Sequence, residues 1–292
     1  MSKYNRRSAM RMAAAGAVGA AAMVGRSRYG GNKPGAIKFG YILGGENESE
    51  LDRAPSPDSV LRSMTENARE FNVYARPWTT IEHQENQGSC AGHALAMAFH
   101  VSLVHRYGVQ ARFSRACAYY MAQTHSNIKG DRGATIGSCA KVAEKGICLE
   151  KDWEYPERYD TTRPDGIFKK MNFKMSSSSR VKDADLAWEL LRSGACIQTG
   201  VAWGAPYEKR ICDKYRGGTI GGHSTLLYGL DPKTDNAVNH NSWGNGWMDG
   251  GRHQWTKKFF SEILKKDRFA VFVAYDSSKL QVPADFVNRC FS

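Results

Sequence analysis

The order in which helical and extended patterns follow one another constrains the fold of this chain more than any single motif. Helical periodicity predicts four helices, over residues 91–107, 114–126, 135–145 and 183–192. Short apolar or β-branched runs divided by Gly, Asp and Asn turns then predict strands over 196–201, 225–230, 237–241, 253–255 and 269–275. Helices first and strands afterwards indicate an α+β protein, with a helical half and a sheet half that meet at a cleft.

The first 30 residues form a separate segment with six basic side chains and no acidic one, and residues 12–25 contain only Ala, Gly, Val and Met. This pattern is typical of an export signal, and Arg6-Arg7 resembles a twin-arginine signal, although the residues that follow match such a signal poorly. The alternative is a helix that docks on an assembly partner, or a tail. No transmembrane anchor is expected, because about 20 strongly apolar residues are needed to cross a bilayer.

The location of the protein therefore stays open at this point. It is secreted or extracytoplasmic if residues 1–25 are a signal, and otherwise intracellular or associated with a particle such as a virion. Residues 31–70 are rich in Gly, Pro, Glu, Asn and Ser, which predicts an extended arm. We expect one domain over 71–292, with its helical lobe at about 84–195 and its β lobe at about 196–276.

Charge and cysteine content exclude several classes of function. The net charge is +12, but half of it lies in residues 1–30, and the rest of the chain carries 35 basic against 29 acidic groups without a basic run interleaved with aromatics. Nucleic-acid binding by the folded domain is therefore not expected. Seven cysteines leave at least one thiol free, and no spacing resembles a zinc site. We expect no metal and no cofactor.

Three residues supply the parts of a thiol-based reaction. Cys90 lies at the start of a predicted helix, where the helix dipole and unpaired N–H groups favour the thiolate. His223 can exchange a proton with that thiol, and the side chain of Asn241 can orient the imidazole. The Gln84 amide and the Cys90 backbone N–H are candidate donors to a developing oxyanion.

With these residues the sequence resembles the papain-like cysteine peptidases, particularly their bacterial-type members, from about Phe71 to Phe272. The order Gln, Cys, His, Asn is that of the family, and His223 and Asn241 follow Cys90 by 133 and 151 residues, close to the roughly 130 to 150 typical of it. The supporting strings are Gly222-His223-Ser224, Asn241-Ser242-Trp243-Gly244 and Gly146-Ile147-Cys148.

The resemblance implies a two-lobed fold, with a helical N-terminal lobe, an antiparallel β-sheet or barrel C-terminal lobe, and the active-site cleft between them. It implies an endopeptidase or exopeptidase that hydrolyses peptide or protein substrates through an acyl-enzyme on Cys90, with His223 as acid and base. Trp243 would shield the His223–Asn241 pair, and Gly133 and Ala134 would line the cleft. The segment before Phe71 is short for the family's helical inhibitory domains, so no long domain of that kind is expected.

One departure opens a second interpretation. Gln84 precedes Cys90 by six positions, as in an active enzyme, but Asn86 to Cys90 also resembles a plant-type string in which the nucleophile comes three residues later, where this chain has His93. That register predicts a catalytically inactive structural or peptide-binding component of a larger assembly such as a virion, with residues 1–30 as its docking segment. The residues after Cys90 favour the active register. A transglutaminase or another acyl transferase is a third hypothesis.

Overall fold

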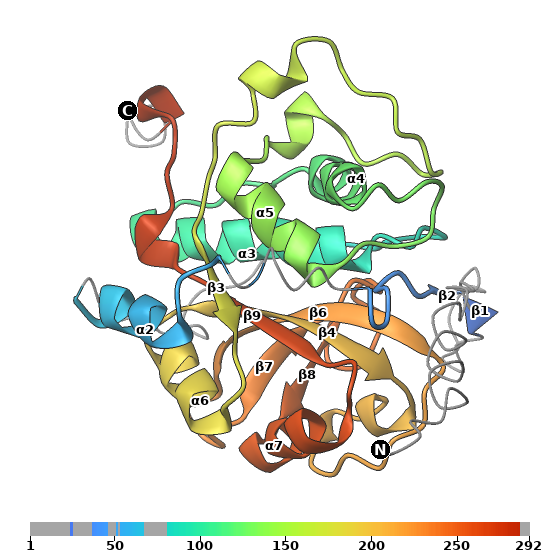
Figure 1. Ribbon diagram of the computed structural model, residues 1–292, viewed down its shortest axis with the longest axis vertical. Helices are drawn as coiled ribbons and strands as arrows, with labels where there is room; N and C mark the ends of the chain where they lie inside the picture. The colour runs from blue at the N-terminus through green and yellow to red at the C-terminus, as the bar shows by residue number, and fades with distance from the viewer. Residues whose placement is uncertain (1–23, 26–36, 46–50, 52, 67–80, 287–292) are drawn as a thin grey trace, which may run out of the picture.

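Figure 1 shows the computed structural model, which describes residues 24–25, 37–45, 51, 53–66 and 81–286. The signal or docking segment predicted for residues 1–30 lies outside these ranges except for Val24–Gly25 (β1), a short strand that pairs with Ile37–Lys38 (β2). The described helices are α2 Pro57–Glu66, α3 Cys90–Tyr107, α4 Arg115–His125, α5 Ile136–Lys145, α6 Ala184–Arg192 and α7 Lys257–Lys266.

Helices α3, α4 and α5 form the helical lobe on one side of the molecule (Figure 1). Nearly every residue of α3 is buried, because α4 and α5 pack on one side of it and the sheet packs on the other. Polar side chains at Ser114 and Thr135 accept a hydrogen bond from the third N–H beyond them and so begin α4 and α5. Gly108 ends α3 in the left-handed conformation, at φ 71°.

The β lobe contains one seven-stranded sheet in the order β3-β9-β4-β6-β7-β8-β5. Its long central strands β4 and β6 are antiparallel, and Val201 pairs with His223 in their register. The pairings in this sheet are antiparallel, as predicted for the lobe, apart from that of β5 with β8, which is parallel. The strand bounds are β3 Ser177–Arg180, β4 Cys196–Trp203, β5 Ile211–Cys212, β6 Gly221–Leu230, β7 Ala237–His240, β8 Arg252–Trp255 and β9 Val271–Tyr275.

Two hydrophobic cores stabilise the two lobes. One lies among α3, α4, α5 and the facing side of the sheet, and the other lies between the opposite side of the sheet and the helices α2, α6 and α7. All four predicted helices form within a residue of their expected ends, and all five predicted strands form. Helices α2 and α7 and strands β3 and β5 were not predicted.

The predicted extended arm is only partly extended. Residues 31–70 include α2, which begins at Pro57 and buries Val60 and Met64 against the β lobe. Pro57 suits the first turn of a helix, and Val60 and Met64 lie four residues apart on one face. The Gly and Pro content of this region does not predict a helix. A helix of ten residues becomes stable only when it packs against another element, which here is the β lobe.

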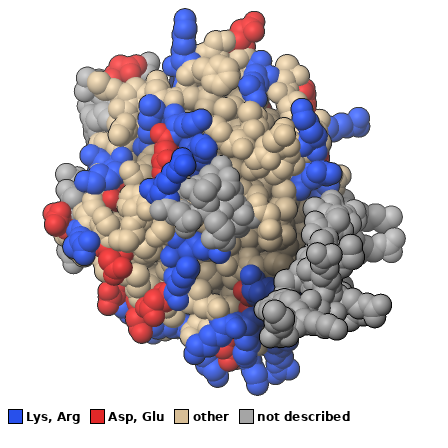
Figure 2. Space-filling view, in the orientation of Figure 1, with Lys and Arg blue, Asp and Glu red and all other residues tan. Residues whose placement is uncertain are grey.

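Surface charge and helix length bear on the predictions about nucleic acids and membranes. Figure 2 shows Lys and Arg over much of the visible face with acidic side chains among them. The absence of nucleic-acid binding stays a prediction. Within the described ranges, none of the helices is both long and apolar enough to cross a membrane.

Candidate active site

Cys90 is the first residue of α3 and is fully buried at 0% exposure. Burial raises the pKa of its thiol to about 11, although nearby backbone groups of Ser224 and Gly40 act in the opposite direction. The thiol is therefore protonated at neutral pH in this arrangement. The helix dipole predicted a thiolate, and the prediction fails here because removal from water outweighs the backbone donors.

His223 and Asn241 form the expected pair. His223 lies on β6 and Asn241 directly follows β7, and the histidine Nε2 donates to Asn241 Oδ1 at 2.8 Å. The backbone N–H of Ser242 donates to the same oxygen, which identifies it as the acceptor. Nε2 therefore carries the ring proton, and Nδ1, which has no hydrogen-bond partner among the described residues, carries the lone pair.

Burial lowers the pKa of His223 to about 4, although the hydrogen bond to Asn241 acts in the opposite direction. The imidazole is neutral at neutral pH, like the thiol. The thiol contacts the backbone of Ser224, the residue that follows His223 on β6.

Trp243 covers the His223 ring. The two rings stack at a centroid distance of 4.6 Å with an interplanar angle of 24°. Trp203 and Phe39 approach the same imidazole edge-on. Trp243 therefore packs as a core residue against the His223 ring, and the shielding role that the resemblance implied for it stays a prediction.

Gln84 is 1% exposed and joins the two lobes. Its Oε1 accepts a hydrogen bond from Ser242 Oγ at 2.6 Å, which fixes the direction of its amide. Its Nε2 donates to the carbonyl oxygens of Gln87 and Lys38, at 2.8 and 2.7 Å. The amide predicted to stabilise an oxyanion is thus already holding a peptide carbonyl, that of Lys38.

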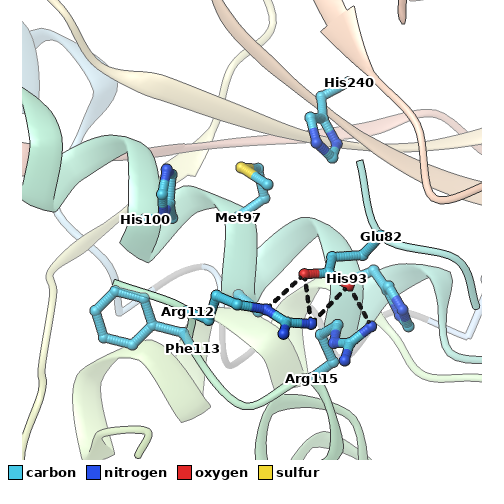
Figure 3. A pocket seen from close by; sticks show the side chains of 9 residues that line it. Glu82, His93, Met97, His100, Arg112, Phe113, Arg115 and His240 are labelled. Carbon is cyan, nitrogen blue, oxygen red and sulfur yellow. Dashed lines mark hydrogen bonds and ion pairs between the residues drawn. The ribbon is translucent and has the colours of Figure 1, made fainter. Parts of the chain in front are cut away.

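His93, the residue in the nucleophile position of the inactive register, lies in a different environment. It lines a cavity of about 30 Å³ with Glu82, Arg112, Arg115 and His240, and Figure 3 shows the ion pairs of Glu82 with both arginines. Its Nδ1 lies 3.2 Å from Ser89 Oγ, and its ring packs edge-on against Tyr155. This placement supports the register in which Cys90 stands in the nucleophile position.

The described cysteines form no disulfide. Among them no disulfide joins Cys90 to Cys139, and none involves Cys117, Cys148, Cys196 or Cys212. Cys290 lies outside the described residues. Nowhere in the described part of the chain do three or more His, Cys, Asp or Glu side chains gather in a way that could hold a metal ion.

Residues 38–42, which we call the cleft segment, lie between the two walls of the site, and sequence reasoning missed them. Ala134 N donates to Gly40 O at 2.8 Å, and Tyr41 N donates to Gly222 O at 2.9 Å. Gly133 and Ala134 therefore lie against this chain's own backbone, and their place in a substrate cleft stays a prediction. The available signal was an apolar run, Phe39 to Leu43, inside an otherwise Gly- and Pro-rich region.

Comparison with solved structures identifies the fold. The structure matches xylellain, a cysteine protease from Xylella fastidiosa, with a TM-score of 0.59 and 21% sequence identity over 86% of this chain and 97% of that one. The chain has the papain-like fold. Digestive procathepsin L 3 of Tenebrio molitor larval midgut also matches it, with a TM-score of 0.55 and 16% identity over 74% of this chain and 78% of that one.

A third solved structure with this fold contains the cysteine protease and lectin-like domains of Cwp84, a surface layer associated protein of Clostridium difficile. It matches with a TM-score of 0.58 and 14% identity over 75% of this chain and 54% of that one. No protein-family model matches the sequence, and no curated protein sequence is similar to it. The papain-like fold thus rests on structure, at sequence identities too low to carry an activity across.

Proposed function

We propose that this protein is a cysteine peptidase that hydrolyses peptide bonds through an acyl-enzyme on Cys90. The observation that carries the proposal is the tautomer of His223. Asn241 engages Nε2, so the lone pair of Nδ1 is the ring site left to accept the proton of a thiol. The neighbouring solved structures are cysteine proteases, which supports the same chemistry at the level of the fold.

The proposed reaction follows from these groups. His223 Nδ1 takes the Cys90 proton, and the sulfur attacks the substrate carbonyl carbon while Gln84 Nε2 and the Cys90 N–H donate to the oxyanion. The imidazolium then protonates the leaving amine as the C–N bond breaks, which leaves a thioester on Cys90. Water, deprotonated by His223, hydrolyses the thioester and restores the thiol.

The Asn241 and Trp243 side chains act through His223 and not on the substrate. Asn241 Oδ1 holds the Nε2–H tautomer, and Trp243 excludes water from that hydrogen bond. Loss of either would leave the nucleophile and base present but poorly oriented.

A second candidate is a peptide-binding component without turnover. It is favoured by one observation: Cys90 and His223 are both fully buried and both uncharged at neutral pH. Peptide hydrolysis needs a thiolate at Cys90 and a substrate in the cleft. Activity therefore requires that the cleft segment move out of the cleft. The absence of a disulfide between Cys90 and Cys139 supports the peptidase, because a bridge there would block the proposed nucleophile.

The test is hydrolysis of a mixed peptide library by the full chain carrying Gly40→Ala. A Cβ at Gly40 would lie 1.8 Å from the Gly88 carbonyl oxygen, a clash that we expect to displace residues 38–42 from the cleft. In that background Cys90→Ala should reduce turnover by about a thousandfold or more, His223→Ala nearly as much, and Asn241→Ala by about ten- to a hundredfold.

The matched control is Cys212→Ala. Cys212 Sγ lies 3.5 Å from His253 Nδ1, so this buried thiol has a histidine neighbour of its own, but it lies in the β-lobe core. Turnover should be unchanged by this substitution. Turnover that survives Cys90→Ala would refute the proposal.

A further inference from the structure

Two cysteines of the helical lobe meet in one place. Cys117 lies in the first turn of α4, and Cys148 lies in the segment that follows α5. Both side chains are 0% exposed, and a hydrogen bond joins their thiols. The groups with the largest influence on the thiols of Cys90, Cys196 and Cys212 include no second cysteine. The pair in the helical lobe therefore differs from these three thiols.

The backbone around Ser114 holds the two cysteines together. The Ser114 N–H donates to the Cys148 carbonyl oxygen at 3.0 Å, and the Ser114 side-chain oxygen accepts from the Cys117 N–H at 2.9 Å. Next to these bonds, Phe113 pairs with Leu149 in an antiparallel bridge. A disulfide requires two side chains that point toward each other across a short backbone separation, and a pair already in contact needs little movement to close.

The Cys148 thiol is a poor nucleophile in the folded protein. Its contact with Cys117 and its burial raise its pKa, and the reactive form in disulfide exchange is the thiolate. Oxidation of the pair therefore belongs to a stage at which solvent and an oxidant reach it, during folding or local opening. Once the lobe has packed, burial protects the bond from reduction.

We propose that Cys117 and Cys148 are a disulfide site, which closes when the chain folds in contact with an oxidant of the disulfide class, such as glutathione disulfide. The thiolate of one cysteine attacks the donor disulfide, so that one donor thiol leaves and a mixed disulfide forms. The thiolate of the other cysteine attacks the protein sulfur of that mixed disulfide, and the second donor thiol leaves. Two protein thiols are thus oxidised by two electrons, the donor disulfide is reduced to two thiols, and the two protons pass to the donor.

The bridge fastens two segments that support the turn before α3. In α4, the Tyr119 hydroxyl donates to Asp131, which also accepts from the Gly88 N–H, each at 2.8 Å. In the segment after α5, the Tyr155 hydroxyl donates to the Gln84 carbonyl oxygen at 2.9 Å. The proposal does not rest on the proposed function, because neither cysteine takes part in the proposed reaction.

The first experiment maps the bond in the full chain. The protein is refolded in a mixture of reduced and oxidised glutathione, its remaining thiols are alkylated with iodoacetamide in denaturant, and it is digested with trypsin without reduction. Cys117 and Cys148 then lie in separate peptides, residues 116–129 and 146–151. Mass spectrometry should find these two peptides linked and the peptide that contains Cys90 alkylated. Alkylation of both peptides, or a link from either to another cysteine, would overturn the proposal.

The second experiment measures what the bond contributes to stability. The two cysteines are 31 positions apart, and a bridge over a loop of that size stabilises the native state mainly by restricting the unfolded chain. The thermal unfolding midpoint of the full chain should be about 5–10 °C lower after treatment with dithiothreitol than in the glutathione mixture. In Cys117→Ala the midpoint should not depend on the reductant.

Cys139→Ala is the matched control, because Cys139 is equally buried in the helical lobe, on α5. This variant should keep the full effect of the reductant on the midpoint. An effect of the reductant that survives Cys117→Ala, or that is absent from the wild type, would contradict the proposal. The peptide map uses the wild-type chain, so it decides the question even where Cys117→Ala fails to fold.

Discussion

At the residue scale, several histidines of this protein are buried, and their protonation depends on that burial. His223, His240 and His253 are all nearly or fully buried, and burial lowers their pKa values to about 4, 3 and 3. His253 accepts a hydrogen bond from Trp255 Nε1 on its Nε2, at 2.9 Å, and its Nδ1 lies 3.2 Å from the Lys209 carbonyl oxygen. Only the neutral ring with its proton on Nδ1 satisfies both contacts.

This arrangement predicts a loss of stability in acid. The unfolded chain binds a proton at His253 near pH 6.5, whereas the folded chain binds it only near pH 3. The free energy of unfolding therefore falls as the pH drops through this window, by up to about 1.4 kcal/mol per pH unit from this group. Urea unfolding of His253→Gln, measured at a series of pH values, should show a slope shallower by about that amount. Identical slopes in the two proteins would contradict the assignment.

At the scale of elements, α2 shows how tertiary packing overrides local composition. It contacts α6 and β3, and it contributes Val60 and Met64 to the β-lobe core at 2% and 1% exposure. Ser277 Oγ lies 3.5 Å from the Met64 sulfur, so the helix also contacts the segment after β9. The region before the domain is therefore attached to the β lobe by a helix, while residues 38–42 occupy the cleft.

Removal of one α2 side chain tests this attachment. Met64→Ala should lower the free energy of unfolding by about 2–5 kcal/mol, because it leaves a cavity in the core. Arg62→Ala, on the exposed face of the same helix, should change it by less than about 0.5 kcal/mol. Chemical denaturation of both variants measures these changes in the free energy of unfolding. Small losses of similar size in the two variants would mean that α2 does not dock on the β lobe in solution.

At the scale of the whole molecule, the two lobes are joined by α3 and by Glu82. The Glu82 carbonyl accepts from Gly244 N of the β lobe at 3.3 Å, while its carboxylate pairs with Arg112 and Arg115 of the helical lobe. Arg115 is 9% exposed and also pairs with Glu150. Glu82 therefore fixes the helical lobe against the loop that carries Trp243.

A comparison of two ion pairs tests this connection. Glu82→Gln should cost on the order of 1–3 kcal/mol of stability, because Arg115 is left with an incompletely compensated buried charge. Asp235→Asn removes the partner of Arg192 in an exposed pair, with side chains 59% and 52% exposed, and should cost less than about 1 kcal/mol. Equal losses in thermal and chemical unfolding would show that Glu82 does not bear on the contact between lobes.

The sequence by itself determined the secondary structure that depends on local patterns. Helical periodicity predicted α4, α5 and α6, and in the structure Ser114, Thr135 and Asp183 cap their first turns with local hydrogen bonds. The order of Gln84, Cys90, His223 and Asn241 in the chain was enough to predict the candidate site and the papain-like fold, and the pairing of His223 with Asn241 followed.

Only the tertiary structure decided the features that depend on residues far apart in the chain. These are the docking of α2, the parallel pairing of β5 with β8, and the position of Phe39 to Tyr41 inside the cleft. The uncharged state of Cys90 and His223 also depends on the tertiary structure. It follows from burial beneath residues 38–42, which precede α3 by about 50 residues in the sequence. Hydrogen bonding and desolvation of this kind arise from contacts that no local pattern records.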